Sequence, residues 1–149
     1  MTISTPRSVF LRLVAAIAFV VTPAALLAQA TMPGASLATI RLPRAALANG
    51  EPLAAGTYAV RLSDAPVTPV VGQSTEGTCW VEFVQSGAVK GQELATVLTG
   101  SALKQVAKEA PPPAGHARVE LLEGDTYERV WINHSGTNYL VHLPVSSGR

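Results

Sequence analysis

The sequence predicts an all-β domain, a single antiparallel β-sandwich of about seven to eight strands with one short helix, which follows an N-terminal leader. Short apolar runs recur along the 149 residues and are separated by clusters of Gly, Pro, Ser, Asn and Asp. In the clearest run, 57–62, large apolar side chains occupy every second position, which is the period of a strand with one buried face. A small barrel is the alternative architecture for the same strands.

Residues 1–30 have the layout of a secretory signal peptide. A basic stretch precedes an apolar run at 13–27, and a small-x-small cleavage sequence follows at 28–30. Pro23 interrupts the apolar run, whereas a retained membrane anchor needs about 20 uninterrupted apolar residues. We therefore expect an exported bacterial protein, periplasmic or extracellular, with no membrane span after the leader is cleaved.

The mature chain is expected to form one domain of ordinary size. Without the 30-residue leader it has 119 residues, with a lead-in at 31–35, the β-sandwich domain at 36–144 and a flexible tail at 145–149. Loss of two leader arginines leaves nine basic and ten acidic residues, a net charge of −1. Such a near-neutral domain offers no electrostatic basis for binding nucleic acid.

Eight candidate strands follow one another along the domain. They lie at 36–42, 57–62, 67–71, 78–84, 89–98, 117–122, 127–133 and 138–143. Pro69 would place the third strand at a sheet edge or a bulge, because proline cannot donate a ladder hydrogen bond. We expect a polar connection at 43–52 and an exposed loop at 72–77. The sequence at 85–87 fits a hairpin turn, and Gly91 indicates a bulge in the following strand.

The β pattern breaks at 101–110, where one or two helical turns are predicted. Ser101 is a candidate N-cap, and apolar residues follow it at helical spacing. The proline run at 111–113 ends this helix as a stiff linker. The last three strands are joined by glycine-containing turns at 123–125 and 134–137, so we predict a three-stranded antiparallel meander.

One short stretch carries a family resemblance. Residues 53–62 read Leu-Ala-Ala-Gly-Thr-Tyr-Ala-Val-Arg-Leu. This stretch resembles the L-x-A-G-T-Y-x-V opening of a strand in prealbumin-like and carboxypeptidase-regulatory-like modules, a phrase that recurs in small secreted bacterial proteins of unknown function. The resemblance implies that Gly56 permits a sharp entry into the strand and that Tyr58 packs under the sheet edge. Because such modules are usually accessory or binding domains, it also implies a binding role, by analogy of fold.

The sequence contains few signs of catalytic chemistry. It has no Gly-x-Ser-x-Gly, Cys-x-x-Cys or His-Glu-x-x-His motif and no glycine-rich phosphate loop, so we expect no cofactor and no resident metal. The alternative to a binding module is a small secreted hydrolase or metal-binding protein. Its carboxylates and imidazoles would be Glu120, Asp125, His134 and His142, which would have to converge in one pocket.

Aromatic side chains are the better indication of a site, because the chain contains so few of them. Trp80 and Trp131 are its two tryptophans, and Arg129 and Tyr139 are near neighbours of Trp131 in the predicted meander. On an exposed sheet face they would form a platform for a sugar ring or a peptide, whereas in the core they would only be packing residues. We therefore expect an exported, non-catalytic binding or envelope-associated module, whose ligand is carbohydrate or another envelope protein.

Cys79 is the single cysteine, so an intramolecular disulfide cannot form. It alternates with Val81 and Phe83, which places it on an apolar strand face as a small buried side chain. The alternative is an intermolecular disulfide between two exported chains, which requires an exposed thiol.

Overall fold

A computed structural model describes residues 34–68, 77–106, 109–122 and 124–146 of the chain. Nine strands and one short helix lie in these ranges, and they confirm the all-β class. In chain order they are β1 (Ser36–Leu42), β2 (Ala46–Ala48), β3 (Glu51–Leu53), β4 (Gly56–Leu62), β5 (Thr78–Gln85), β6 (Ala88–Leu98), α1 (Gly100–Val106), β7 (His116–Leu122), β8 (Tyr127–His134) and β9 (Thr137–Pro144).

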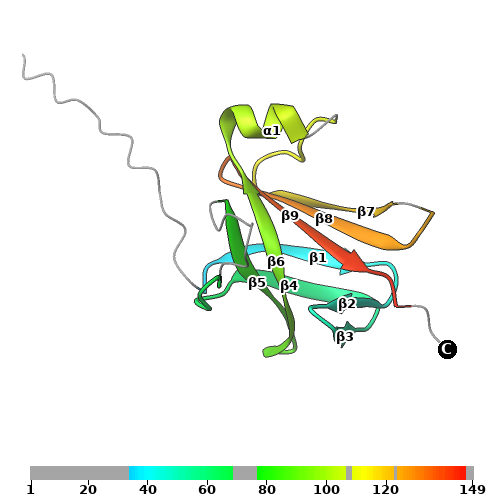
Figure 1. The fold of residues 1–149 in the computed structure, drawn as a ribbon. Coiled ribbons are helices and arrows are strands. Elements are labelled where there is room, and N and C mark those ends of the chain that lie inside the picture. The colour runs from blue at the N-terminus through cyan, green and yellow to red at the C-terminus, as the bar shows by residue number, and fades with distance from the viewer. Residues whose placement is uncertain (1–33, 69–76, 107–108, 123, 147–149) are drawn as a thin grey trace, which may run out of the picture.

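Seven of the strands form one antiparallel sheet in the order β1-β4-β5-β6-β9-β8-β7. This sheet curls until it is nearly closed, so that β1 lies against β7 and β8 without joining their hydrogen-bonded ladder (Figure 1). The short strands β2 and β3 form a separate hairpin that packs against β6 and β9 at one end of the curled sheet. Helix α1 lies at the opposite end (Figure 1).

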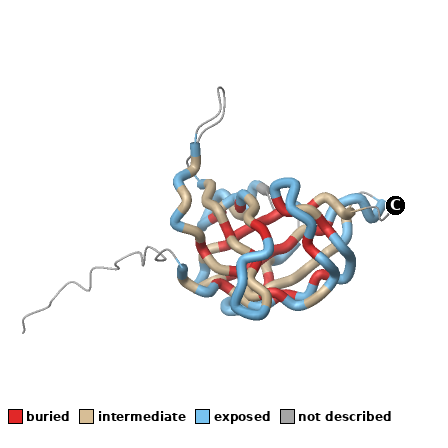
Figure 2. The backbone as a smooth tube through the Cα atoms, turned by 90° about the horizontal axis from the view of Figure 1, so that it is seen from below, coloured by how far each residue is buried: buried red, intermediate tan, exposed pale blue. Residues whose placement is uncertain are grey.

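The inner face of the curled sheet holds the main core. Every strand of both sheets contributes to it, and buried residues alternate with exposed ones along the strands (Figure 2). The largest apolar side chains that are almost wholly buried there are Tyr58, Phe83, Leu42, Leu53, Ile132 and Leu143. Burial of one sheet face explains the period of two in the sequence.

A second, smaller core lies on the outer face. Leu98, Trp131 and Leu140 are buried together, and Leu103 of α1 packs against them. The helix therefore covers the outer face of the sheet where these three side chains would otherwise meet water. This packing accounts for a short amphipathic helix in a domain that is otherwise all β.

Three hairpins close through two-residue turns whose central residues both have positive φ. Asn49 and Gly50 join β2 to β3, with φ of 47° and 86°; Ser86 and Gly87 join β5 to β6, with φ of 51° and 77°; and Ser135 and Gly136 join β8 to β9, with φ of 52° and 88°. This is the conformation that matches the twist of antiparallel strands, and glycine adopts it without strain. The predicted hairpin and the predicted C-terminal meander are both confirmed.

The β2–β3 hairpin corrects the expectation of a polar connection at 43–52. Each strand has only three residues, too few to show a period of two, yet Ala46, Ala48 and Leu53 are buried. Residues 67 and 68 are not in a strand, and the remainder of the predicted strand at 67–71 lies outside the described residues, as do positions 72–76 of the predicted loop.

Two further boundaries differ from the expectation. Helix α1 begins at Gly100, and the N–H of Ala102 donates to the carbonyl of Thr99 at 3.1 Å, so Ser101 lies inside the helix and is not its N-cap. Val145 and Ser146 belong to the predicted flexible tail, but their N–H groups donate to Thr126 O and Ala45 O, each at 2.8 Å. Positions 147–149 and the leader lie outside the described residues.

The expected bulge near Gly91 is present. Phe83 pairs with Gly91 and Val84 with Val89, which leaves Lys90 as the extra residue in β6. A β-carbon at Gly91 would stand 3.0 Å from the Cβ of Ala48, which is tighter than nine in ten real Cβ contacts. The glycine is therefore needed because the β2–β3 hairpin packs directly on β6 at this point.

Replacing Gly91 with alanine is expected to lower the free energy of unfolding by about 1–3 kcal/mol, because its methyl group would overpack the contact with Ala48. Urea denaturation measures the loss. Combining Gly91→Ala with Ala48→Gly removes the clash, so the double variant should lose less stability than the two single variants summed. Strictly additive losses would contradict the contact as the reason for glycine.

Candidate functional site

The outer face of β4, β5 and β6 carries a regular array of polar and apolar side chains. The array occupies two neighbouring rows across the three strands, one mainly polar and one containing a tryptophan. Its six residues, which we call the outer-face site, are Arg61, Ser63, Trp80, Glu82, Gln92 and Leu94.

Strand register places these side chains side by side. Arg61 pairs with Glu82, and Glu82 pairs with Gln92, which forms the polar row. Trp80 pairs with Leu94 in the next row. The N–H of Ser63 donates to the carbonyl of Trp80 at 3.0 Å, so the chain just beyond β4 continues that row. Because residues two apart on a strand share a face, both rows point outward, away from the inner core.

The polar row is tied together by hydrogen bonds. Arg61 Nε lies 2.6 Å from Glu82 Oε2 in an ion pair, and Gln92 Nε2 donates to Glu82 Oε1 at 2.9 Å. The Ser63 hydroxyl donates to Glu82 Oε1 at 3.3 Å. These contacts hold Glu82 in one orientation with its neighbours, and such mutual support fixes side-chain positions before any ligand arrives.

The electrostatics of the row favour an ionised Glu82. Partial burial would raise the pKa of this carboxyl, but the hydrogen bonds from Arg61, Gln92 and Ser63, together with the positive charge of Arg61, lower it below its ordinary value. At neutral pH the row therefore presents a carboxylate and a guanidinium that largely neutralise each other. It offers directional hydrogen-bonding groups with little net charge.

Trp80 and Leu94 supply the apolar part of the site. Leu94 is 39% exposed, and Trp80 is half-buried beside it. A hollow of about 270 Å³ adjoins the polar row, where Gly34, Leu62 and Asp64 complete the lining made by three residues of the site. An accessible indole beside fixed polar groups and a hollow is an arrangement suited to binding a small polar ligand.

Trp131 has a different environment from Trp80. It is 1% exposed, and its Nε1 donates to Asn138 Oδ1 at 2.8 Å. The guanidinium carbons of Arg118 and Arg129 lie 5.2 Å and 5.6 Å from the centroid of the indole, in cation–π contact with it. Arg129 also forms an ion pair with Glu120. This cluster seals the outer-face core, so Trp80 is the more accessible of the two tryptophans.

Tyr139 does not lie beside Trp131. It pairs with Ile132 on the inner face and is buried in the main core, whereas Trp131 pairs with Leu140 on the outer face. The structure thus brings Arg129 and Trp131 together and separates Tyr139 from both.

The four residues of the hydrolase alternative are distributed along the meander. Glu120 and His142 are both register partners of Arg129, on opposite sides of it. Asp125 lies in the β7–β8 turn, at the other end of β8 from His134, whose Nδ1 is 3.3 Å from Leu37 O. Within the described ranges, no three His, Cys, Asp or Glu side chains gather closely enough to hold a metal ion.

Gly56 and Tyr58, the two positions singled out in the family-like stretch, are both closely packed in the structure. Tyr58 is buried, its hydroxyl donates to Ala54 O at 2.8 Å, and its ring meets Phe83 edge-on at a centroid distance of 6.3 Å. A β-carbon at Gly56 would lie 3.1 Å from Gln85 Nε2, so the strand begins in close contact with β5.

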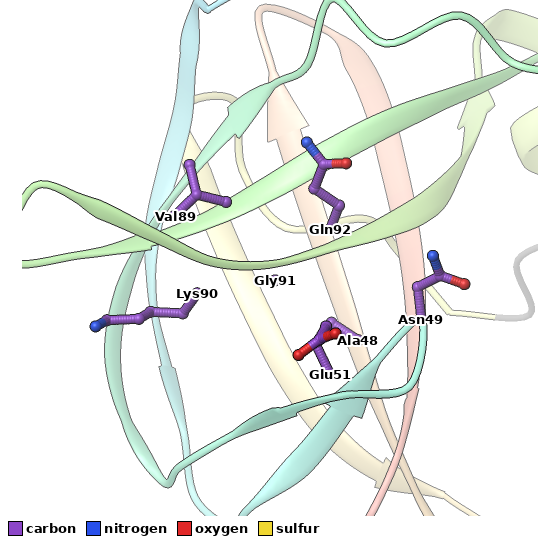
Figure 3. A pocket seen from close by; sticks show the side chains of 7 residues that line it. All are labelled: Ala48, Asn49, Glu51, Val89, Lys90, Gly91 and Gln92. Carbon is purple, nitrogen blue, oxygen red and sulfur yellow. The ribbon is translucent and has the colours of Figure 1, made fainter.

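A second hollow, of about 310 Å³, lies between the β2–β3 hairpin and the bulge of β6. Gly91 is one of its lining residues, and the side chains of Lys90, Glu51, Asn49 and Gln92 splay away from one another around it (Figure 3). Because these groups do not converge on a common point, the hollow does not define a chemistry for a ligand.

Most of the outer-face site was not identifiable from the sequence. Strand alternation places Trp80 and Glu82 on one face, but it does not say which residues of β4 and β6 stand beside them. Arg61 and Gln92 become neighbours of Glu82 only through the pairing of three strands. The signal available in the sequence was the alternation of Arg61 and Ser63 with the apolar residues Val60 and Leu62 of β4.

Comparisons with known proteins leave this site to be interpreted from its own geometry. No protein-family model, curated protein or solved structure matches the chain. Over the part of the chain that the structure describes, none of the helices has the length and hydropathy required to cross a bilayer.

Acrylamide quenching is expected to separate the two tryptophans. Trp80 is half-buried and Trp131 almost wholly buried, so Trp80→Phe should remove most of the quenchable fluorescence. Trp131→Phe should leave a protein that is quenched more strongly than the wild type. Equal quenching constants for these two variants would contradict the assigned environments.

Cys79 is expected to react slowly in the folded protein. Burial raises the pKa of its thiol to about 11, so little thiolate exists near pH 8. Alkylation by iodoacetamide should accelerate as the pH approaches about 11, whereas the guanidinium-unfolded chain should react readily near its ordinary pKa of about 8.5. Equal rates for the folded and unfolded chains would instead indicate an exposed thiol that could form the intermolecular disulfide.

Proposed function

We propose that this chain is an exported, non-catalytic binding module that takes carbohydrate on the outer-face site. The observation that carries the proposal is the half-buried Trp80 beside the hydrogen-bonded row of Arg61, Glu82 and Gln92. Export, to the periplasm or the cell exterior, is supported by the layout of the first 30 residues.

The apolar part of the site suits one face of a sugar ring. A pyranose carries a patch of C–H groups that packs on an indole, and Trp80 with Leu94 offers an accessible surface of this kind. The rigid indole loses little conformational entropy on binding, because its orientation is already restricted by partial burial.

The polar row suits the hydroxyl groups at the rim of the same ring. Vicinal hydroxyls can donate to a carboxylate and accept from a guanidinium or an amide, and Glu82, Arg61 and Gln92 supply these three groups within one row. Since the row is close to neutral overall, it favours an uncharged glycan over a strongly acidic one. The adjoining hollow of about 270 Å³ provides room for a substituent of the ring.

A partner protein is the other ligand class that the sequence suggested. The described surface supports it less directly, because the exposed apolar side chains Val89, Leu94, Leu121 and Tyr127 are dispersed over several strands. A large continuous apolar patch is the usual mark of a protein-docking surface.

Trp80→Ala is expected to weaken binding to a responsive neutral glycan by about tenfold or more, because it removes the stacking surface. A glycan array followed by titration calorimetry of the purified mature chain provides the measurement. Gln92→Ala should weaken binding by about fivefold, the effect of one lost hydrogen bond.

The matched control is Tyr127→Ala. Tyr127 is 38% exposed and also aromatic, but it lies at the start of β8, outside the outer-face site. Loss of the Tyr127 side chain should leave the affinity for the glycan unchanged. A glycan whose affinity responds to Tyr127 and not to Trp80, or the absence of any glycan ligand, would overturn the proposal.

A further inference from the structure

The nearly closed sheet leaves a seam between its two edge strands, β1 and β7. These strands lie against each other but do not pair as neighbours in the sheet. Near one end, the ring of His134 approaches the carbonyl of Leu37. At the other end, Arg44, just after β1, forms an ion pair of 2.7 Å with Asp125 of the β7–β8 turn. Side-chain contacts therefore span the seam at both ends.

Glu128 lies behind the Arg44–Asp125 ion pair and is 0% exposed. Its Oε1 accepts a hydrogen bond of 2.9 Å from the main-chain N–H of Arg44. Its Oε2 is also buried and has no hydrogen-bond partner among the described residues. One carboxyl oxygen thus holds the segment after β1 by a hydrogen bond. The other oxygen is buried without a hydrogen bond that would offset its loss of contact with water.

The charged groups around Glu128 do not neutralise it directly. Arg44 lies in the segment after β1, and its guanidinium forms an ion pair with Asp125 of the β7–β8 turn. The register partners on the flanking strands are Leu121 of β7 and Leu143 of β9, which are apolar. Burial raises the pKa of Glu128, and the N–H and positive charge of Arg44 offset only part of that effect.

We propose that Glu128 and the segment carrying Arg44 form a latch across the β1–β7 seam, closed while Glu128 is protonated and released when Glu128 ionises. The protonated carboxyl is neutral, so its burial costs less than that of a carboxylate. Ionisation places a charge in a site with one hydrogen bond and one unpartnered oxygen. Movement of the segment away from β8 then lets water reach Oε2 and relieves this cost.

The sign of the pH dependence follows from linkage. A carboxyl whose pKa is raised in the folded state contributes its full stabilisation below its unfolded pKa and loses it as the pH rises through the folded value. The latch is therefore tightest in mildly acidic solution and loosens towards neutral and alkaline pH. This inference does not depend on the proposed carbohydrate site, which lies on other strands.

Hydrogen exchange of the full mature chain tests the latch. Protection factors, corrected for the intrinsic pH dependence of exchange, are measured from about pH 4.5 to about pH 8. Protection of the Arg44 amide and of β7 should fall by about twofold or more over this range, while protection across β5 and β6 stays constant. In the same titration, the Arg44 amide proton resonance should shift as Glu128 ionises.

Two variants make the outcome decisive. Glu128→Gln keeps the shape and an acceptor for the Arg44 N–H but cannot ionise, so its seam protection should not depend on pH. Asp125→Asn weakens the exposed ion pair and should lower seam protection at every pH while keeping the pH dependence. Constant protection in the wild type, or an equal fall in Glu128→Gln, would overturn the proposal.

Discussion

The burial of one face of a single curled sheet is the constraint on which the other features depend. Seven antiparallel strands supply an inner face, and curling the sheet is what allows that face to enclose its own core. Hairpin turns with positive φ make β5 and β6, and likewise β8 and β9, neighbours in this sheet. The two edge strands are consequently brought together by curvature and not by pairing.

This curvature also decides which residues can take part in function. Every second side chain is committed to the core, so binding groups must lie on the outer face or at the two ends. Over β8 and β9, the outer face is itself sealed, by Trp131 with two stacked arginines and by Leu103 from α1. Over β4, β5 and β6 it stays accessible, and there the strand register assembles an indole, a carboxylate, a guanidinium and an amide into adjoining rows.

The seam and the outer-face site illustrate two ways of placing a carboxyl group in such a sheet. Glu82 is surrounded by donors, and its pKa is lowered, so it is a stable ionised element of the proposed binding surface. Glu128 is buried with one donor and one unpartnered oxygen, and its pKa is raised. The first arrangement fixes side chains in place, whereas the second makes local stability respond to pH.

Local sequence patterns determined the parts of this protein that depend on neighbours along the chain. Alternation identified β4, glycine-containing turns identified the β5–β6 hairpin and the C-terminal meander, and Gly91 indicated the bulge, because each is governed by backbone conformation or by one buried face. The β2–β3 hairpin was not predicted, because strands of three residues are too short to show a reliable alternation of apolar and polar residues. Only the tertiary structure decided that Trp131 is covered while Trp80 is accessible, that Tyr139 faces inward, and that Glu128 is buried behind Arg44. These outcomes depend on strand register and sheet closure, which bring together residues far apart in the chain. No local sequence pattern indicates either of them.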